Sequence, residues 1–359
     1  MRGVTCGAAV LAVIFAAFGS ADAANDAKTL VGTHIVTVPR EVRFVDREGH
    51  PLGAARGGTV LDVLQVDGEM LRVDRGWIKR GEVMPQDEAV DFFSRLIEKE
   101  PTAVVLASRA RVWNYLGEFD KAIDDCNEAL RFDPQCAMAF DRRAQALTGK
   151  GKLDEALADF EKAIKLTPQY ASTYSHRARA WLRKGDLDRT LADCDEALKR
   201  EPSLSVAHYF RGRVWSRKAA PEKAIAGFTK ALTLNPHYVP ALNARGNELY
   251  KKGEFAKAEA DYNAAIRLDP KFDIVHIHCN RGNARLRLNR IDLAKADYEQ
   301  ALRYDDKHIP AMQGLAACFA VQQNYKSAVQ WQQKAVQLAK ADQRKKLEAV
   351  LATYQSARK

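Results

Sequence analysis

Arginine recurs at one fixed position along most of the chain, and aspartate recurs at a second position. The guanidinium fork matches a carboxylate in two parallel hydrogen bonds, so these residues predict ion pairs that bridge neighbouring helices. A row of ligand-binding groups is the alternative interpretation. Gly227 stands where one aspartate is expected, so Arg211 is predicted to lack its partner. The arginine row consists of Arg109, Arg143, Arg177, Arg211, Arg245 and Arg281, and the aspartates are Asp125, Asp159, Asp193, Asp261 and Asp297.

A second set of polar residues lies two places after each row arginine. Amide and guanidinium donors in one line suit an acidic or extended peptide, and the alternative is a solvated face that binds nothing. Arg183, Arg217, Arg142 and His176 lie nearby in the pattern and extend this surface. We call the main set, Arg111, Gln145, Arg179, Arg213, Asn247 and Asn283, the donor column.

Residue patterns typical of catalysis are missing from the sequence. It contains no glycine-rich phosphate loop, nucleophile elbow, paired-carboxylate signature or histidine spacing for a metal. His278 lies two residues from His276 and one from Cys279, and residues one or two apart do not share a helix face, which argues against a metal site there. Cys126 and Cys194 occupy a position that is aromatic elsewhere and are predicted to be buried free thiols. The sequence therefore predicts no enzyme, no metal and no cofactor, although an enzyme using the irregular segment 272–279 stays an alternative.

The elements that carry these residues repeat with a period of 34. Five prolines mark it, Pro134, Pro168, Pro202, Pro236 and Pro270, and small residues recur three times within each period. Two further copies follow, the first of them displaced by an insertion between Phe272 and His278. Large apolar residues keep helical spacing, interrupted by turns at Gly117, Gly151, Gly185 and Gly253. A fixed period of this kind predicts a stack of helix pairs.

This pattern resembles the tetratricopeptide repeat, with seven copies over residues 103–340. The resemblance implies a mainly α fold, a right-handed superhelical α-solenoid whose first helices line a concave groove. The donor column would then face the groove, where relatives grip a peptide. Residues 87–101 are predicted to form an N-terminal capping helix, and residues 341–359 a C-terminal one.

The N-terminus has the pattern of an export signal. Residues 1–23 combine Arg2, an apolar run from Ala8 to Phe18, and the small residues Ala21 and Ala23. The run is much shorter than the ~20 residues of a spanning helix. We therefore expect a signal peptide cleaved near Ala23, a periplasmic or secreted protein and no transmembrane span after cleavage, with a retained membrane anchor as the alternative.

Residues 30–84 consist of short β-type runs separated by glycines. The order Gly58-Thr59, Val66 to Val73, and Gly76-Trp77-Ile78 resembles the bacterial SH3-like domain. The resemblance implies a small all-β barrel that binds cell-wall peptides or other proteins.

The balance of charged residues limits the classes of partner that the protein is expected to bind. The chain has 56 basic and 46 acidic residues, a formal charge of +10 that favours acidic partners. Acids interleave with the basic residues in every repeat, so nucleic acid is not expected. The sequence thus predicts a non-enzymatic scaffold that binds a protein or extended peptide, of acidic character, in the envelope or outside the cell. The alternative is a cell-wall-associated structural or enzyme-accessory protein that binds through the barrel, with the solenoid as a spacer.

Overall fold

The computed structural model describes residues 34–37, 41–45, 51–56, 60–62, 65–67, 70–73, 76–79 and 83–358. The predicted signal peptide and its cleavage point lie outside these residues. The contacts divide the chain into two compact units. Unit 1 comprises Met1–Val214 and Leu234–Pro236, and unit 2 comprises Trp215–Thr233 and His237–Lys359. We describe each unit by itself.

The described N-terminal strands pair into two antiparallel sheets, with strand orders β4-β1-β8 and β3-β2-β7-β6-β5. A closed barrel is not seen among these strands. Strands β3 and β8 contain Pro51, Gly53 and Pro85, residue types that disfavour β structure, and their positions were not predicted. The strands are β1 (His34–Thr37), β2 (Glu41–Val45), β3 (Pro51–Arg56), β4 (Val60–Asp62), β5 (Gln65–Asp67), β6 (Met70–Val73), β7 (Gly76–Lys79) and β8 (Val83–Pro85).

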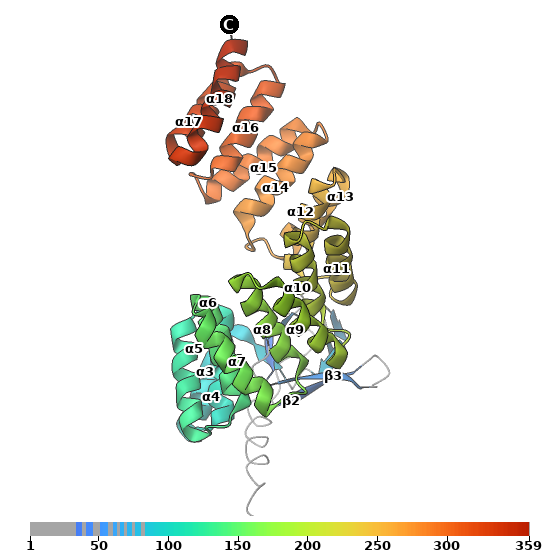
Figure 1. The fold of residues 1–359 in the computed structure, drawn as a ribbon, viewed down its shortest axis with the longest axis vertical. Helices are drawn as coiled ribbons and strands as arrows, with labels where there is room; N and C mark the ends of the chain where they lie inside the picture. Colours follow the sequence, from blue (N-terminus) through green and yellow to red (C-terminus); the bar gives the residue numbers. More distant parts are fainter. Residues whose placement is uncertain are drawn as a thin grey trace, which may run out of the picture. The chain divides into compact units, whose positions relative to one another are not determined.

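The remaining described residues form sixteen helices that follow one another in chain order (Figure 1). The first of them, α3 (Gln86–Lys99), lies at the predicted N-terminal cap. Two helices per repeat follow: α4 (Ala103–Leu116), α5 (Phe119–Phe132), α6 (Ala137–Lys150), α7 (Leu153–Leu166), α8 (Ala171–Lys184), α9 (Leu187–Arg200), α10 (Ser205–Arg217), α11 (Pro221–Leu234), α12 (Val239–Lys251), α13 (Phe255–Leu268), α14 (Ile274–Arg287), α15 (Ile291–Tyr304), α16 (Ile309–Val321) and α17 (Tyr325–Leu338). The last helix, α18 (Ala341–Ala357), packs on α17 at the predicted C-terminal cap.

The helices end where the sequence supplies stop signals. Second helices such as α5 end before a proline, which cannot continue a helix, and the Asp133 amide caps the carbonyl of Ala129. First helices such as α4 end at a residue with positive φ, the conformation that glycine adopts most readily. Gly117, Gly151, Gly185 and Gly253 fill this position in four repeats, and Ala219, Asn289 and Gln323 take the same conformation in the others.

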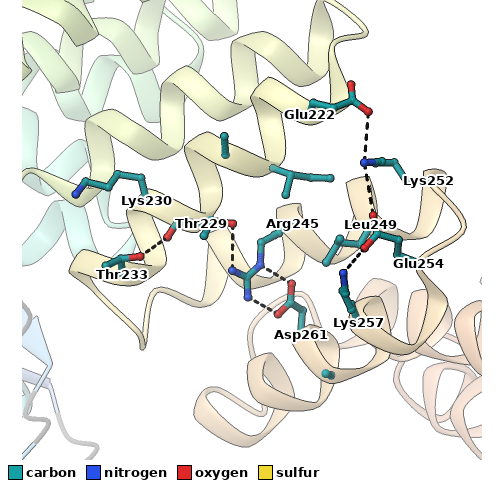
Figure 2. Close-up of a pocket in the computed structure, with 13 residues that line it drawn as sticks. Glu222, Thr229, Lys230, Thr233, Arg245, Leu249, Lys252, Glu254, Lys257 and Asp261 are labelled. Carbon is teal, nitrogen blue, oxygen red and sulfur yellow. Dashed lines mark hydrogen bonds and ion pairs between the residues drawn. The ribbon is translucent and has the colours of Figure 1, made fainter.

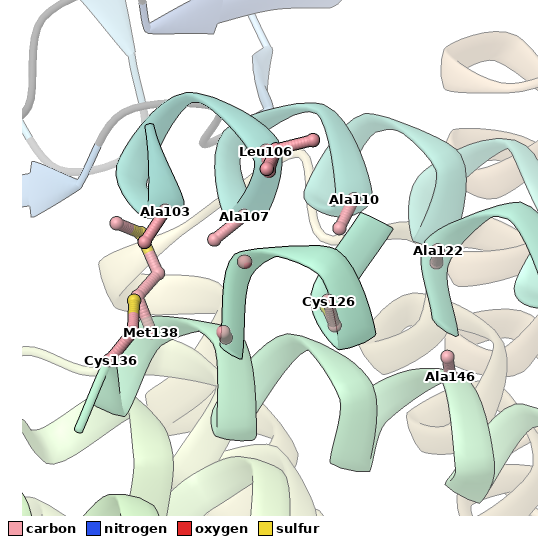
Figure 3. Close-up of a cluster of buried hydrophobic side chains, with 11 residues drawn as sticks. Ala103, Leu106, Ala107, Ala110, Ala122, Cys126, Cys136, Met138 and Ala146 are labelled. Atoms are coloured by element: carbon pink, nitrogen blue, oxygen red, sulfur yellow. The ribbon is translucent and has the colours of Figure 1, made fainter. Parts of the chain in front are cut away.

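The core consists of small residues between the helices of each pair. In repeat 1, Ala110, Ala122 and Ala129 are fully buried. Figure 3 shows Ala110 and Ala122 with Leu106 and Cys126 of the same cluster. Alanine at these positions lets the helix axes approach, as α4 and α5 do in unit 1 and α14 and α15 in unit 2. The stack of helix pairs predicted from the period, and the mainly α solenoid that the resemblance implies, are therefore confirmed. Among the described residues, no helix combines the length and apolarity that crossing a bilayer requires.

Candidate functional site

The arginine row is tied to the second helix of its own repeat. The Arg109 Nε and Nη2 atoms donate to Asp125 Oδ2 and Oδ1 at 2.9 and 2.7 Å. Arg281 contacts Asp297 in the same way, with its Nη2 at 2.5 Å from Oδ1. All five aspartates are buried, so the charges are held away from solvent. The structure brings together Arg109 with Asp125, Arg143 with Asp159, Arg177 with Asp193, Arg245 with Asp261, and Arg281 with Asp297.

Several row arginines make a third contact that sequence reasoning missed. Their Nη1 atoms reach back to the helix that precedes their own, which joins consecutive repeats. The signal was present in the sequence as a Ser, Asn or Thr about sixteen residues before the arginine. The contacts are Arg109 to Ser94 at 3.0 Å, Arg143 to Asn127 at 2.7 Å, Arg245 to Thr229 at 3.3 Å and Arg281 to Asn263 at 2.8 Å.

Arg211 is not without a partner, contrary to the expectation from Gly227. Its Nη1 lies 3.7 Å from Asp195 Oδ1, and both side chains are largely exposed. Asp195 stands sixteen residues before Arg211, where other row arginines meet their third contact. The backward contact therefore persists in the repeat that lacks the forward one.

The buried aspartates differ in their charge environment. Burial raises the pKa of Asp193, because Arg177 alone does not offset the loss of solvent. Asp297 is also buried, but hydrogen bonds from His278 and Arg281 and the charge of Arg285 hold its pKa below the ordinary value. Arg285 Nη1 lies 2.9 Å from Asp297 Oδ2, and its Nε lies 2.9 Å from Glu259 Oε1. Repeat 6 thus contains a charge network where repeat 3 contains one pair.

In unit 1, part of the donor column makes hydrogen bonds within the protein. The Gln145 amide donates to Asp141 Oδ2 at 2.9 Å and lies 3.2 Å from the His176 ring nitrogen. Arg183 donates to the Thr148 carbonyl at the end of α6. Arg142, predicted to extend the surface, is only 1% exposed and pairs with Asp141. Arg111 is half-buried on α4 and Arg179 is exposed on α8.

His176 belongs to this cluster rather than to an open donor surface. Burial lowers its pKa, although Asp141 favours the charged form. The ring nitrogen Nδ1 lies 3.0 Å from Asp141 Oδ1. Sequence reasoning placed Arg142 and His176 on the surface because helical spacing alone does not show how closely neighbouring first helices pack.

The last positions of the donor column are built differently. Arg213 donates to the Tyr209 hydroxyl at 2.8 Å, and Arg217 is exposed at the end of α10. Asn247 Oδ1 accepts from the Tyr262 hydroxyl at 2.7 Å and from Asn280 at 3.0 Å. Asn283 Oδ1 accepts from the Tyr298 hydroxyl at 2.8 Å.

Hydrogen bonds to the side-chain oxygens of Asn247 and Asn283 therefore fix the orientation of both amide groups. Each carboxamide oxygen is occupied by a tyrosine, and each Nδ2 group makes no hydrogen bond within the described part of the chain. Both asparagines are half-buried on neighbouring first helices, α12 and α14, which contact each other. Unit 2 thus holds two amide donors in a fixed orientation on its first-helix side.

Glycine makes room for each tyrosine. A methyl group on Gly246 would lie 2.7 Å from the Tyr262 ring, and one on Gly282 would lie 2.8 Å from the Tyr298 ring. Repeats 1 to 3 carry Ala110, Ala144 and Ala178 at this position, with Cys126, Phe160 and Cys194 on the second helix. Glycine, asparagine and tyrosine therefore form one unit in repeats 5 and 6.

Three family models match parts of this helical region. A tetratricopeptide repeat model matches residues 239–272, a TPR repeat model matches residues 144–185, and a further tetratricopeptide repeat model matches residues 279–343. The chain carries tetratricopeptide repeats. The resemblance read from the prolines and small residues is confirmed for these repeats.

Solved structures show the same fold at low sequence identity. The APC/C hetero-tetramer Cut9–Hcn1 matches with a TM-score of 0.64 and 16% identity, covering 75% of this chain and 52% of that chain. A monomeric IFIT1 mutant with Gppp-AAAA matches with a TM-score of 0.55 and 18% identity, covering 71% and 68%. Pseudomonas aeruginosa pilF matches with a TM-score of 0.52 and 18% identity, covering 65% and 99%. The chain thus spans about half the length of the Cut9–Hcn1 chain it matches.

The histidines and cysteines of the tetratricopeptide repeats have local partners or are buried. His276 Nδ1 lies 2.7 Å from Asp273, and His278 Nδ1 lies 3.2 Å from Asp297. Burial raises the pKa of the Cys194 thiol to about 12, and all five cysteines of the described residues are buried free thiols. Within the described residues, no group of three or more His, Cys, Asp or Glu side chains could hold a metal ion.

Proposed function

We propose that this protein is a non-enzymatic scaffold that binds an extended peptide segment of a protein partner along the donor column. The observation that carries the proposal is the pair of oriented amides at Asn247 and Asn283. An amide NH2 group is a good donor to a backbone carbonyl, and a donor held in place loses little conformational entropy on binding. Cut9, which is similar in fold, forms a hetero-tetramer with Hcn1, so a solenoid of this type can hold a protein partner.

The partner segment is acidic in this proposal. Arg111, Arg179 and Arg213 occupy the same position in the earlier repeats, and the whole chain carries a formal charge of +10. Arginine at a binding surface favours carboxylates and speeds the encounter with an acidic partner. Changing these three arginines to glutamate is expected to abolish binding of an acidic peptide while the helices stay folded.

The location and the N-terminal module are part of the same proposal. Residues 1–23 would direct export, and residues 30–84 would form an SH3-like barrel that supplies a second contact, with a protein or with cell-wall material. Support comes from the apolar run and small residues of the N-terminus and from the antiparallel succession of β5, β6 and β7. Cell fractionation followed by N-terminal sequencing of the mature protein tests export, and export fails if the mature chain begins at Met1 in the cytoplasm.

The binding proposal is tested with Asn247→Asp and Asn283→Asp. Each change keeps the oxygen that accepts from tyrosine but replaces the donor NH2 with a charged oxygen. Asn324→Asp is the matched control, because Asn324 Oδ1 accepts from the Ser327 amide at an exposed helix start. Peptides selected from a random displayed library on the full chain serve as probes.

Loss of one donor hydrogen bond is worth about 1 kcal/mol or more, so each groove variant should weaken peptide binding roughly tenfold. The control should bind as the wild type does. Fluorescence anisotropy with the selected peptides gives the dissociation constants. Equal affinity for the wild type and both groove variants would exclude the donor column as the binding site.

A further inference from the structure

A second surface of unit 2 contains a cleft that the arginine row and the donor column do not explain. It lies between the second helices α11 and α13, is also lined by Arg245 and Leu249 of α12, and has a volume of about 840 Å³ (Figure 2). This volume is within the range of ligand-binding clefts in proteins. Its apolar lining comes from Ile225, Ala226, Leu249 and Ala260. The alanines are exposed, so the cleft opens to solvent.

Other repeats fill the equivalent space with their own side chains. Trp181 stands at the position of Leu249 two repeats earlier, where it is 8% exposed and packs in a cluster with Leu157. Arg285 stands there in the next repeat, where it pairs with buried Glu259 at 2.9 Å. Leu249 and Ile225 are smaller than tryptophan and carry no charge, so they neither fill this space nor form an ion pair across it. Leu147 and Ile123 hold the same two positions three repeats earlier, where they pack together in a hydrophobic cluster. The cleft therefore depends also on the small residues Ala226 and Ala260 in its lining.

The charges around the cleft are almost fully compensated inside the protein. Lys252 lies 3.4 Å from Glu222 and 3.5 Å from Glu254, while Lys257 lies 2.7 Å from Glu254. Arg245 is bound to Asp261, as the rest of the arginine row is to its aspartates.

Lys230 is different. It lines the cleft, is exposed, and makes no ion pair with any described residue. Figure 2 shows it at one end of the cleft beside Thr229 and Thr233, with the pair of Glu222 and Lys252 at the other end. One positive charge beside an apolar floor is thus left for an external group.

We propose that this cleft is a second docking site, which takes a short segment of a protein partner with a large aliphatic side chain next to an acidic residue. The aliphatic side chain occupies the space that tryptophan fills in repeat 3, and the carboxylate meets Lys230. An aliphatic anchor in a pocket with polar groups at its edge is the usual form of an interaction hot spot.

The test uses the full chain and a random displayed peptide library, with counter-selection on Leu249→Trp. This change fills the cleft with the residue that the chain itself uses at position 181. Ala260→Glu is a second blocking variant at an exposed position, which keeps the test valid if the tryptophan disturbs folding. Lys230→Glu removes the positive charge. Lys162→Glu is its matched control, because Lys162 holds the same register two repeats earlier, beside the position filled by Trp181.

The expected result is a set of peptides in which an aliphatic residue adjoins Asp or Glu. Their affinity, measured by fluorescence anisotropy, should fall at least tenfold with Leu249→Trp and Ala260→Glu, roughly threefold to tenfold with Lys230→Glu, and remain unchanged with Lys162→Glu. Loss of affinity in Asn247→Asp and Asn283→Asp instead would assign the peptides to the donor column and overturn this proposal.

Two further outcomes would also contradict the proposal. The first is that no selected peptide distinguishes the wild type from the blocking variants. The second is that analytical ultracentrifugation shows self-association of the wild type that Leu249→Trp removes, which would make a second copy of this chain the occupant. Neither outcome would affect the proposed function of the donor column.

Discussion

The arginine row and the donor column stand two residues apart on the same helices, which places them about 200° apart around the helix axis. Row arginines such as Arg281 point to a buried aspartate on the second helix of the repeat and to a polar residue on the helix before. Column residues such as Asn283 meet the second helix only through a tyrosine hydroxyl on their oxygen. Arg109, Arg143, Arg245 and Arg281 use their guanidinium donors within the protein, whereas the NH2 group of Asn283 makes no hydrogen bond to the described residues.

A comparison inside the donor column teaches the same lesson. Gln145 and Asn247 occupy the same repeat position and carry the same functional group. The Gln145 amide nitrogen is bound to Asp141, whereas the Asn247 amide oxygen is bound to Tyr262 and Asn280. Which atom of the amide is left over depends on the neighbouring helices. Residue type at a repeat position is therefore not enough to identify a binding residue.

Removing a row aspartate should have the largest effect, because it tests the architectural role of the row. Asp297→Ala leaves Arg281 and Arg285 without their shared carboxylate in a buried site. Breaking a buried ion pair by removing one partner costs about 3–5 kcal/mol. Urea denaturation of the full chain measures the loss. Asp195→Ala, at an exposed pair, should cost no more than about 1 kcal/mol, and an equal loss in both variants would contradict the distinction.

A smaller loss of stability should follow from Gly246→Ala. The added methyl group would meet the Tyr262 ring at 2.7 Å, and overpacking of this kind costs about 1–3 kcal/mol. The double change Gly246→Ala with Tyr262→Cys recreates the pair Ala110 and Cys126 of repeat 1, and should recover part of the loss. Thermal unfolding compares the single and double variants. A double variant that is less stable by the sum of the two single losses would contradict a direct contact between the two positions.

Removing a tyrosine hydroxyl should affect binding more than stability. Tyr298→Phe removes the hydroxyl that donates to Asn283 Oδ1, whereas Tyr262→Phe leaves Asn247 Oδ1 still bound to Asn280. Each change should cost about 1 kcal/mol of stability. Peptide affinity should fall more with Tyr298→Phe than with Tyr262→Phe, because only Asn283 is then free to rotate. Anisotropy titrations test the order, and the reverse order would contradict the orienting role of tyrosine.

The smallest effect is a difference in pH dependence between two row aspartates. The lowered pKa of Asp297 means that its contribution to the unfolding free energy is present above the ordinary value of 3.8 and is lost as the pH falls below it. The raised pKa of Asp193 means that the folded state binds a proton first, so stability rises as the pH falls through that pKa.

Urea denaturation of Asp297→Asn and Asp193→Asn from about pH 7 to about pH 3 separates the two cases. The destabilisation by Asp297→Asn should shrink toward low pH. The destabilisation by Asp193→Asn should grow over the same range. Parallel profiles for the two variants would contradict the difference between the single pair in repeat 3 and the charge network in repeat 6.

Much of the helical fold could be predicted from the sequence, because each of its rules acts over a short distance. Pro134 and its equivalents end the second helices, Gly117 and its equivalents end the first, and the alanines mark where the two helices touch. The same periodicity did not predict Ala219 at a positive φ, or strand β3 at Pro51–Arg56, since local residue types argue against both. Contacts with other parts of the chain decided the backbone conformation at Ala219 and in strand β3.

The candidate sites were predicted less completely. Asn247 and Asn283 were proposed as binding residues from their place in the repeat, but the tyrosines that orient them belong to another helix. Arg142 was expected on the surface and is buried, where it pairs with Asp141 of its own helix. The cleft at Leu249 could not be found from hydropathy, since Leu249 fits the apolar pattern as well as Trp181 does. The cleft exists because the side chains around Leu249 are too small to fill the space between the helices.

The sequence by itself determined the period, the helix ends and the residues that the row and the column would contain. These follow from backbone preferences and helical spacing, which depend on neighbours a few residues away. The tertiary structure alone decided that four of the row arginines join three helices, that the Asn247 and Asn283 NH2 groups stay unpaired among the described residues, and that a cleft between α11 and α13 is left unfilled. Each of these depends on distances between side chains of different helices, and a pattern along one chain does not contain them.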